Sequence, residues 1–380
     1  MVNTVTPGSV YDRLGVKSVI NAHHWRTMLG GSIMPREVLD AMVDSANHFV
    51  DVDDLTLRAG AYIADLANAE AAMVTAGCAA AQLLQAAACI AGRDRAKMLQ
   101  LPDTTGMRNE IIIQKIQRNK YDVAFRGAGA KLVEIGSESK TTIEDLELAI
   151  GPDTAAVAFV WVMRFNGLSL EDVIETSHTR GIPVIMDAAA ELPPVDNLSR
   201  FISMGVDMVA FSGGKGVRGP QSTGILVGRK DLIEIAMEHT RSGETTATVA
   251  RPMKVCKEEI VGLIAALDLF VNTDHEAEWA DWRKKANAVL DSIRSVQGIS
   301  TIVNEGPEFP GPNAPTATII LGESWQGPSP QAVVQTMLNG DPPIHIGDGP
   351  EPNVLWIAPV TLQEGETEII AKRLMEALIG

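Results

Sequence analysis

Lys215 is the residue whose setting most clearly suggests chemistry. It lies in the glycine-rich stretch AFSGGKGVRGPQSTG (210–224), at the end of an apolar run. A lysine amine in such a loop binds nucleotide phosphates or forms a Schiff base with a carbonyl group. The nucleotide motif GxxxxGK[ST] is not met, because Val209 stands where the first glycine belongs and Gly216 follows the lysine. Two hypotheses for Lys215 therefore remain. It either forms a Schiff base with a cofactor or is a solvent-exposed turn residue without a chemical role.

An acidic residue, Asp187, lies at the end of a second apolar run, IPVIMDAA (182–189). A carboxylate there is costly unless a cation pairs with it, and the protonated ring nitrogen of pyridoxal 5'-phosphate is such a cation. The phosphate of that cofactor needs N–H groups at a helix start, which TAGCAAA (75–81) offers, and Ser212 adds a hydroxyl. Taken one at a time, each feature has an ordinary structural explanation: Asp187 as a strand cap, TAGCAAA as a tight helix contact and the lysine loop as a turn. Together they predict pyridoxal 5'-phosphate as cofactor.

These residues must be positioned by the strands and helices that alternate through the middle of the chain. Apolar strands are predicted over 154–162, 182–189 and 206–212, helices over 169–181 and 197–205, and a further strand and helix within 222–239. Continuous apolar strands indicate a sheet covered on both faces, and the alternation indicates a mainly parallel α/β sheet. Ligands of such sheets bind at the carboxyl ends of the strands, where Asp187 and Lys215 are expected.

The first part of the chain supplies further elements. Helices are predicted over 35–47, 58–69 and 142–150, strands over 97–102 and 130–136, and a strand, glycine turn and long helix over 71–92. The segment 109–119 suits a helix and a strand equally. A helix that begins at Cys78 would direct its first N–H groups toward an anion.

The last part of the chain has a different texture. Two amphipathic helices are predicted over 257–271 and 275–296, followed by short strands and helices rich in turn residues. This pattern predicts a small α+β C-terminal domain. We expect an N-terminal segment over 1–40, a large cofactor-binding domain over 41–260 and the small domain over 261–380, with the boundary between about 255 and 275.

Composition excludes several classes of function. The 380 residues carry a net charge of −16 and a pI near 4.9, which disfavours a nucleic-acid partner or an anionic membrane surface. The three cysteines form neither a disulfide framework nor a metal-ligand spacing, and the first residues lack the basic and apolar regions of a signal peptide. A cytoplasmic protein without a metal centre is expected.

Several stretches together resemble a known family. VINAHHWRTMLGGSIMPREVLDAM, ANAEAAMVTAGCAAA, GIPVIMDAA and the lysine motif SGxKxxxGPQ are similar to the selenocysteine-synthase-like branch of pyridoxal-phosphate enzymes. That branch contains L-seryl-tRNA selenium transferases and D-glucosaminate-6-phosphate ammonia-lyase-like proteins. The resemblance implies fold type I, the aspartate aminotransferase-like α/β fold, with a mainly parallel seven-stranded sheet in the large domain.

The resemblance also implies roles for individual residues. Lys215 would bind the cofactor covalently and move protons at the substrate α-carbon, and Asp187 would pair with the ring nitrogen. Ala189 would lie against one ring face, and Gln117 stands where ammonia-lyase-like relatives carry a histidine for the other face. The phosphate would be held by Gly77, Cys78, Ala79 and Ser212. The family implies a homodimer or larger homo-oligomer with its site at the interface.

The expected reaction is an α,β-elimination of the ammonia-lyase type on a hydroxylated or sugar amino acid such as D-glucosaminate 6-phosphate, in which the β-hydroxyl leaves and hydrolysis then releases ammonia. A racemase or epimerase, an aldolase and an aminotransferase share the same first steps, and a catalytically dead binding homologue is the non-enzymatic alternative. An aminotransferase is disfavoured because no arginine occurs between Arg294 and Arg373. Candidates for contact with a small anionic amino-acid substrate are His23, His24, Arg26, Arg58, Arg164, Arg218 and His345.

Overall fold

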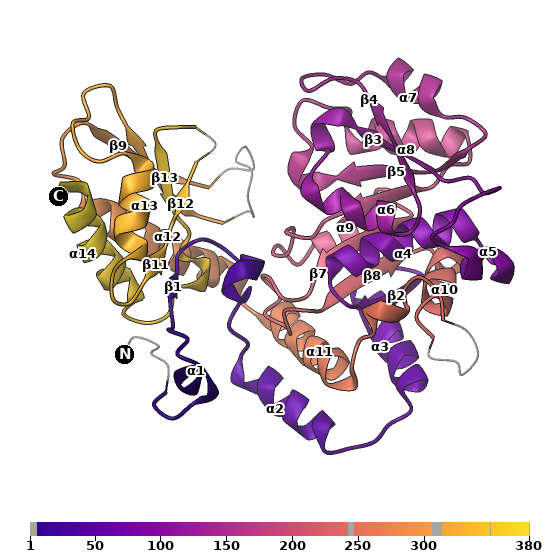
Figure 1. Cartoon of the computed structure of the whole chain (residues 1–380), viewed down its shortest axis with the longest axis horizontal. Coiled ribbons are helices and arrows are strands. Elements are labelled where there is room, and N and C mark those ends of the chain that lie inside the picture. The colour runs from indigo at the N-terminus through magenta and orange to yellow at the C-terminus, as the bar shows by residue number, and fades with distance from the viewer. Residues whose placement is uncertain (1–5, 242–246, 306–313, 350, 380) are drawn as a thin grey trace. The chain divides into compact units, whose positions relative to one another are not determined.

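A computed structural model describes residues 6–241, 247–305, 314–349 and 351–379 of the chain. By internal contacts the chain divides into two compact units (Figure 1). The large unit is Met34–Thr273, and the small unit joins Met1–Ile33 to Asp274–Gly380. The boundary expected at 260 falls inside a helix, Lys257–Asn272, and the first 33 residues group with the C-terminal part of the chain.

Seven strands among the described residues of the large unit form one sheet in the order β2-β8-β7-β6-β5-β3-β4. They are β2 (Ala71–Thr75), β3 (Glu110–Gln114), β4 (Lys131–Ile135), β5 (Thr154–Val160), β6 (Val184–Asp187), β7 (Met208–Ser212) and β8 (Gly224–Gly228). Strand β8 runs antiparallel to both of its neighbours, and the other pairs are parallel. The predicted mainly parallel α/β sheet is therefore confirmed.

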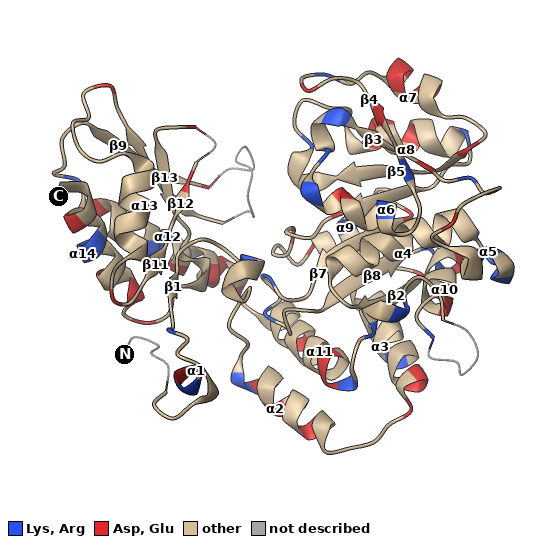
Figure 2. Ribbon diagram, in the orientation of Figure 1, with Lys and Arg blue, Asp and Glu red and all other residues tan. Residues whose placement is uncertain are grey.

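Helices cover both faces of this sheet. The helices of the large unit are α2 (Arg36–Ala46), α3 (Val52–Leu66), α4 (Cys78–Ala91), α5 (Arg95–Gln100), α6 (Val123–Gly127), α7 (Ile143–Ala149), α8 (Leu170–Thr179), α9 (Asn197–Ser203), α10 (Lys230–Glu238) and α11 (Lys257–Asn272). Figure 2 shows the central strands almost free of charged residues, with acidic residues on outer helices such as α7. Most of the charge therefore lies outside the sheet, and Asp187 at the end of β6 is a buried exception.

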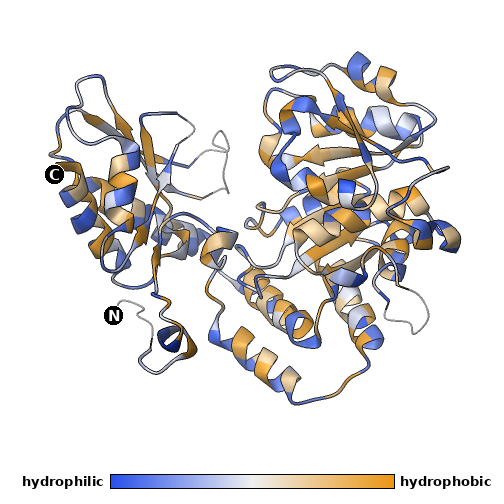
Figure 3. Cartoon of the chain, in the orientation of Figure 1, coloured by the Kyte–Doolittle hydropathy of each residue, from blue (hydrophilic) through white to orange (hydrophobic). Residues whose placement is uncertain are grey.

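Successive strand residues point to opposite faces, and two apolar cores result. Val184, Met186, Val209 and Phe211 belong to the core that packs against α3, α8, α9 and α11. The residues between them, such as Ile185 and Ala210, belong to the core that packs against α4, α6 and α10. Figure 3 shows the resulting apolar strands. The alternation of side chains directs Asp187, two residues after Ile185, toward the α4 side.

One predicted element is wrong and others shift their ends. The segment 97–102, predicted as a strand, lies mostly in helix α5, because the Asp94 side chain accepts hydrogen bonds from the N–H groups of Ala96 and Lys97 and caps it. Helix α3 begins at Val52, earlier than predicted, because Asp51 caps its first turn. The undecided segment 109–119 contains strand β3 and then a 3-10 helix over Lys115–Gln117.

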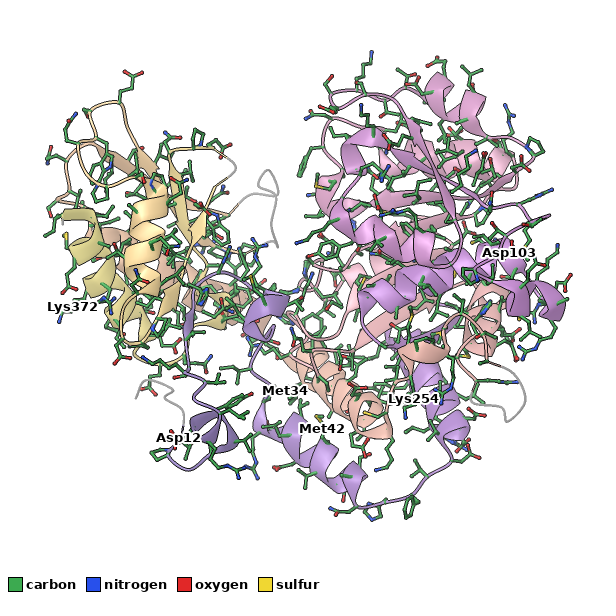
Figure 4. The ribbon with its side chains drawn as sticks, in the orientation of Figure 1. Asp12, Met34, Met42, Asp103, Lys254 and Lys372 are labelled. Atoms are coloured by element: carbon green, nitrogen blue, oxygen red, sulfur yellow. The ribbon has the colours of Figure 1, made fainter. Side chains whose placement is uncertain are left out.

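Helix α2 lies along α11 within the large unit (Figure 1), and a glycine sets their close approach. A side-chain Cβ at Gly262 of α11 would lie 2.7 Å from Cγ of Met42, which Figure 4 labels on α2. A larger residue at position 262 would push the two helices apart.

The small unit has its own α+β core. Its elements are α1 (Val10–Arg13), β1 (Ile20–Asn21), α12 (His275–Ser292), β9 (Ile299–Asn304), β10 (Thr316–Leu321), α13 (Pro330–Leu338), β11 (Ile344–His345), β12 (Gly347–Asp348), β13 (Val354–Ile357) and α14 (Glu366–Ile379). An antiparallel sheet has the order β12-β13-β10-β9, and β1 pairs in parallel with β11. The pairing of β1 with β11 ties the first residues of the chain to this unit.

Two leucines of helix α7 test the packing of the large unit. Leu146 is completely buried, whereas Leu148 on the same helix is 87% exposed. We expect Leu146→Ala to lower the free energy of unfolding by about 2 to 5 kcal/mol, because it removes buried methyl groups and leaves a cavity. The matched change Leu148→Ala should alter it by less than about 0.5 kcal/mol in the same denaturant titration followed by circular dichroism. Equal effects of the two changes would contradict the predicted core.

Candidate active site

Asp187 lies at the carboxyl end of β6, in the middle of the sheet. Its neighbours in register are Val160 at the end of β5 and Ala210 on β7. Oδ1 accepts a hydrogen bond from the Ala189 N–H at 3.0 Å and lies 3.8 Å from Sγ of Cys78 at the start of α4. The side chain thus points to the α4 face, as the alternation along β6 requires.

The electrostatics of Asp187 call for a cation. Burial raises the pKa of this carboxyl, while the Ala189 N–H, the charge of Lys215 and the Gln82 side chain lower it in that order. Within the described part of the chain no salt bridge reaches Asp187. A buried carboxylate without a paired cation is costly, so the site suits a ligand that brings its own positive charge. The protonated ring nitrogen of pyridoxal 5'-phosphate meets that requirement.

The loop that carries Lys215 follows β7 and is held at both sides. The Gly219 N–H donates to the Gly213 carbonyl at 2.8 Å, and the Gly213 N–H donates to the Thr223 carbonyl at 2.9 Å. A Cβ at Gly214 would lie 2.3 Å from the Cα of Gln221, and one at Gly216 would lie 2.2 Å from the Leu192 carbonyl oxygen. The glycines are therefore required for close backbone contacts that fix the position of the lysine.

The start of helix α4, predicted to bind the cofactor phosphate, lies at the same edge of the sheet. Gly77 is its N-cap with a φ of 84°, a left-handed conformation that favours glycine, and Ala79 in the first turn is exposed. Across the sheet, Ser212 pairs with Gly224, which pairs with Thr75 just before the cradle. A Cβ at Gly224 would lie 2.4 Å from the Gly77 carbonyl carbon. The first N–H groups of this fourteen-residue helix and the Ser212 hydroxyl thus occupy one edge of the sheet, and they suit a phosphate.

A side-chain hydrogen bond to the end of β5 places Gln117 at the same edge of the sheet as Asp187. Its Oε1 accepts the Val160 N–H at 2.9 Å, and Val160 is the register neighbour of Asp187. Its Nε2 is buried and has no hydrogen-bond partner among the described residues. A buried donor without a partner is costly, and a ligand acceptor would satisfy it. Ala189, the residue predicted for the other ring face, is half-buried beside Asp187.

Gln82 is a site residue that the sequence interpretation missed. It is buried on α4 one turn after Cys78, with Nε2 4.0 Å from the Cys78 Sγ, and it stabilises the ionised form of Asp187. Burial raises the pKa of the Cys78 thiol, and the negative charge of Asp187 raises it further. Cys78 therefore stays protonated and packs against the carboxylate as a neutral group. Gln82 lies four residues after Cys78, and this spacing places both side chains on one face of a helix. The sequence could have indicated Gln82 through that spacing.

The arginines predicted for substrate have different surroundings. Arg164 stacks over the rings of Trp161 and Phe165, with its guanidinium carbon 4.6 and 4.4 Å from their centroids. Arg218 lies in the same loop as Lys215, with a left-handed φ of 59°. Arg58 is exposed on α3 and forms a salt bridge with Asp54 at 2.8 Å.

The remaining substrate candidates come together in the small unit. His345 pairs in register with Asn21, and the rings of His23 and His24 lie 4.6 and 5.3 Å from that of Trp356. The Arg26 guanidinium lies 5.9 Å from the same ring. Burial and the charge of Arg26 lower the pKa of His23 to about 4 and that of His24 to about 3. These two histidines are therefore neutral near pH 7.

The described residues contain no group of three or more His, Cys, Asp or Glu side chains that could hold a metal ion. They also contain no helix that is both long and apolar enough to span a membrane.

The sheet order, the lysine loop and the buried acid define a pyridoxal-phosphate enzyme of fold type I, and the residues at this edge fit that cofactor. The family model "L-seryl-tRNA selenium transferase" matches residues 19–285. The chain belongs to this family.

Individual relatives span nearly the whole chain. D-glucosaminate-6-phosphate ammonia lyase from Salmonella typhimurium is 30% identical over 380 residues, covering 98% of each chain. The 5'-C-glycyluridine monooxygenase-decarboxylase from Streptomyces sp is 29% identical, covering 97% of this chain and 92% of the relative. A solved structure of D-glucosaminate-6-phosphate ammonia-lyase superposes with a TM-score of 0.82 at 29% identity, covering 98% of each chain.

Asp187→Asn tests the proposed pairing with the ring nitrogen. An amide carries no charge to hold that nitrogen protonated, so we expect exchange of the substrate α-proton to fall by about 100-fold or more. Bound cofactor should persist, because Lys215 is unchanged. Exchange is measured by NMR in heavy water and bound cofactor by its absorbance. The exposed Asp196, changed to Asn, is the control, and an unaffected exchange rate in Asp187→Asn would refute the pairing.

Proposed function

We propose that this enzyme is an ammonia-lyase that eliminates water across the α- and β-carbons of a hydroxylated or sugar amino acid and then releases ammonia by hydrolysis. The observation that carries the proposal is the full-length similarity to a relative named D-glucosaminate-6-phosphate ammonia lyase, in a chain that keeps the lysine, the acid and the phosphate cradle together. D-Glucosaminate 6-phosphate is the first substrate to test. The net charge of −16 supports a small-molecule substrate in place of a tRNA.

The proposed mechanism assigns one proton to each of two groups. Bound pyridoxal 5'-phosphate supplies an electron sink for the pair left at the substrate α-carbon. Lys215 would hold the cofactor and, as a free amine, would remove the α-proton. Asp187 would keep the ring nitrogen of the bound cofactor protonated. Loss of the β-hydroxyl as water leaves an unsaturated amine that hydrolyses to a 2-keto acid and ammonia.

Several cationic and polar side chains are proposed as candidates for recognition of an anionic substrate. In the large unit Arg218 lies three residues after Lys215 in the same loop, and Arg164 is held by two aromatic rings, which supports a fixed guanidinium for an anionic group. In the small unit the cluster of His23, His24, Arg26 and His345 offers several donors around one tryptophan. Arg58 is assigned to an interface between copies of the chain.

The reaction is tested with D-glucosaminate 6-phosphate and with simple β-hydroxy amino acids in heavy water. We expect 2-keto acid and ammonia in equal amounts, at a rate abolished in Lys215→Ala. Exchange of the α-proton with loss of chirality and no keto acid would indicate a racemase or epimerase. Release of an aldehyde would indicate an aldolase, and keto acid without ammonia a transamination. Protein that shows no cofactor absorbance after reconstitution would refute an enzymatic role altogether.

We also propose that the enzyme is a homodimer or larger homo-oligomer in the cytoplasm. Apolar side chains are exposed along α2, the following turn and the start of α3: Leu39, Val43, Phe49, Val50, Val52 and Leu57. Leu39 and Val43 share one face of α2, and Phe49 is fully exposed at 105%. A continuous apolar face of this kind favours burial against a second copy of the chain. Arg58, adjacent to Leu57, would then lie at the interface. The free cysteines Cys78, Cys89 and Cys256 support a reducing compartment.

The double change Val43→Asp with Phe49→Asp tests this interface. Two charges on the apolar face should weaken association by at least about tenfold, because their desolvation opposes burial. Sedimentation measures the mass of the wild type, the variant and the control Leu148→Asp, whose leucine is exposed on α7. A monomeric wild type at micromolar concentration would contradict the proposal.

A further inference from the structure

A second buried acid, Glu191, lies four residues after Asp187 and has no role in the mechanism above. It is only 3% exposed. Its backbone is engaged, since its N–H donates to the Ala188 carbonyl at 3.1 Å and its carbonyl accepts from Nδ2 of Asn197 at 2.7 Å. In the described part of the chain its carboxyl forms no salt bridge. The side chain is therefore buried without the partners that a structural carboxylate normally has.

The segment that carries Glu191 packs against the lysine loop. Leu192, the next residue, has its carbonyl oxygen 2.2 Å from the position of a Cβ on Gly216, and Cδ of Pro193 lies 2.7 Å from it. Gly216 directly follows Lys215. Backbone contact this close keeps Glu191 beside the loop whose lysine would hold the cofactor.

Four charged groups act on Glu191, each from a different element. They are Arg164 after β5, Asp187 on β6, Lys215 after β7 and Arg200 on α9. Burial raises the pKa of Glu191, as does the negative charge of Asp187, while Arg164, Lys215 and Arg200 lower it. The resulting pKa is about 7. A large share of Glu191 is therefore protonated in neutral solution.

The chemistry of elimination requires a proton that the mechanism above does not supply. Hydroxide is a poor leaving group, and a β-hydroxyl departs readily only as water. Lys215 receives a proton from the α-carbon, and Asp187 must stay ionised to hold the ring nitrogen protonated. A general acid with a pKa close to the working pH is the efficient donor.

We propose that Glu191 is the general acid that protonates the departing β-hydroxyl group. The step balances within the substrate and the two side chains. The α-proton passes to the Lys215 amine, the electron pair forms the bond between the α- and β-carbons, the β-carbon–oxygen bond breaks, and the oxygen leaves as water with the Glu191 proton. The inference rests on the elimination reaction proposed above and assigns its leaving-group step.

The surroundings of the two acids support this division of roles. Asp187 accepts an N–H from Ala189 and is stabilised as the anion by Gln82, whereas no described side chain donates a hydrogen bond to the Glu191 carboxyl. Burial raises the pKa of both carboxyls, but only Asp187 would pair with the cationic ring nitrogen of the cofactor, which would keep Asp187 ionised and leave Glu191 as the proton donor.

Glu191→Gln separates the two proton transfers. The amide preserves shape but donates no proton, so we expect elimination from a β-hydroxy amino acid to fall by about 100-fold. Exchange of the α-proton with deuterium should persist, because Lys215 is intact. The analogue with chloride in place of the hydroxyl should restore elimination in the variant, since chloride leaves without a proton. Glu175→Gln, at an exposed position on α8, is the matched control and should behave as the wild type.

The pH dependence gives a second measurement that needs no folded variant. The acid form is the active one, so kcat/KM of the wild type on the hydroxy substrate should decline as pH rises through about 7. The chloro substrate should lack this limb. Independently of turnover, infrared spectra of the cofactor-free wild type should contain a protonated-carboxyl band that disappears over the same pH range and is absent from Glu191→Gln.

The outcomes distinguish this inference from the proposed function. A wild type that releases no keto acid and ammonia from any hydroxy substrate refutes the elimination, whatever Glu191 does. A wild type that eliminates, with Glu191→Gln equally fast, overturns the acid role. Loss of exchange together with elimination, or a variant equally slow on the chloro substrate, also overturns it, because Glu191 would then position substrate or cofactor. If the variant does not fold, a wild type without the infrared band overturns the proposal.

Discussion

The structure of the site depends on one buried negative charge. Asp187 lies at the end of a central strand, between Val160 and Ala210, where water cannot solvate it. The Ala189 N–H, Gln82 and the nearby lysine oppose the desolvation cost only in part. A cofactor with a protonated ring nitrogen completes the balance, and the phosphate cradle and the lysine loop lie where the rest of such a cofactor would be bound. The charge that suits the ring nitrogen is therefore the same charge that the proposed chemistry uses.

The sheet brings these groups together through its two-residue periodicity. Ile185, Asp187, Ala210 and Ser212 all direct their side chains to the α4 face, while their neighbours build the opposite core. A register shift of one residue in the strand that carries Asp187 would turn its carboxyl to the opposite face and put an apolar side chain in its place. Close backbone contacts at Gly214, Gly216 and Gly224 then hold the loop and the cradle against this edge. Close packing therefore fixes the loop and the start of α4 relative to the ends of the strands.

The family contains relatives with different reactions on one scaffold. An ammonia lyase and a monooxygenase-decarboxylase both span nearly the full length of this chain at similar identity. The groups that bind the cofactor define what is common to such enzymes, and the acids, bases and cations placed around the substrate select the reaction. Glu191 and Arg164 are the side chains of the large unit that we propose for this second set.

The sequence by itself determined the α/β class, most of the helices and strands, and the cofactor, and it singled out the pair Lys215 and Asp187 as candidates, because apolar periodicity, helix caps and motif spacing are local signals. It failed at 97–102, where a capping aspartate outweighed an apolar run, and it left 109–119 undecided. Only the tertiary structure decided the boundary at 273, the pairing of β1 with β11, and the positions of Gln82 and Glu191. Those features arise from contacts between distant segments and from burial. The neighbours of a charged residue in the sequence do not indicate how deeply its side chain is buried in the folded chain.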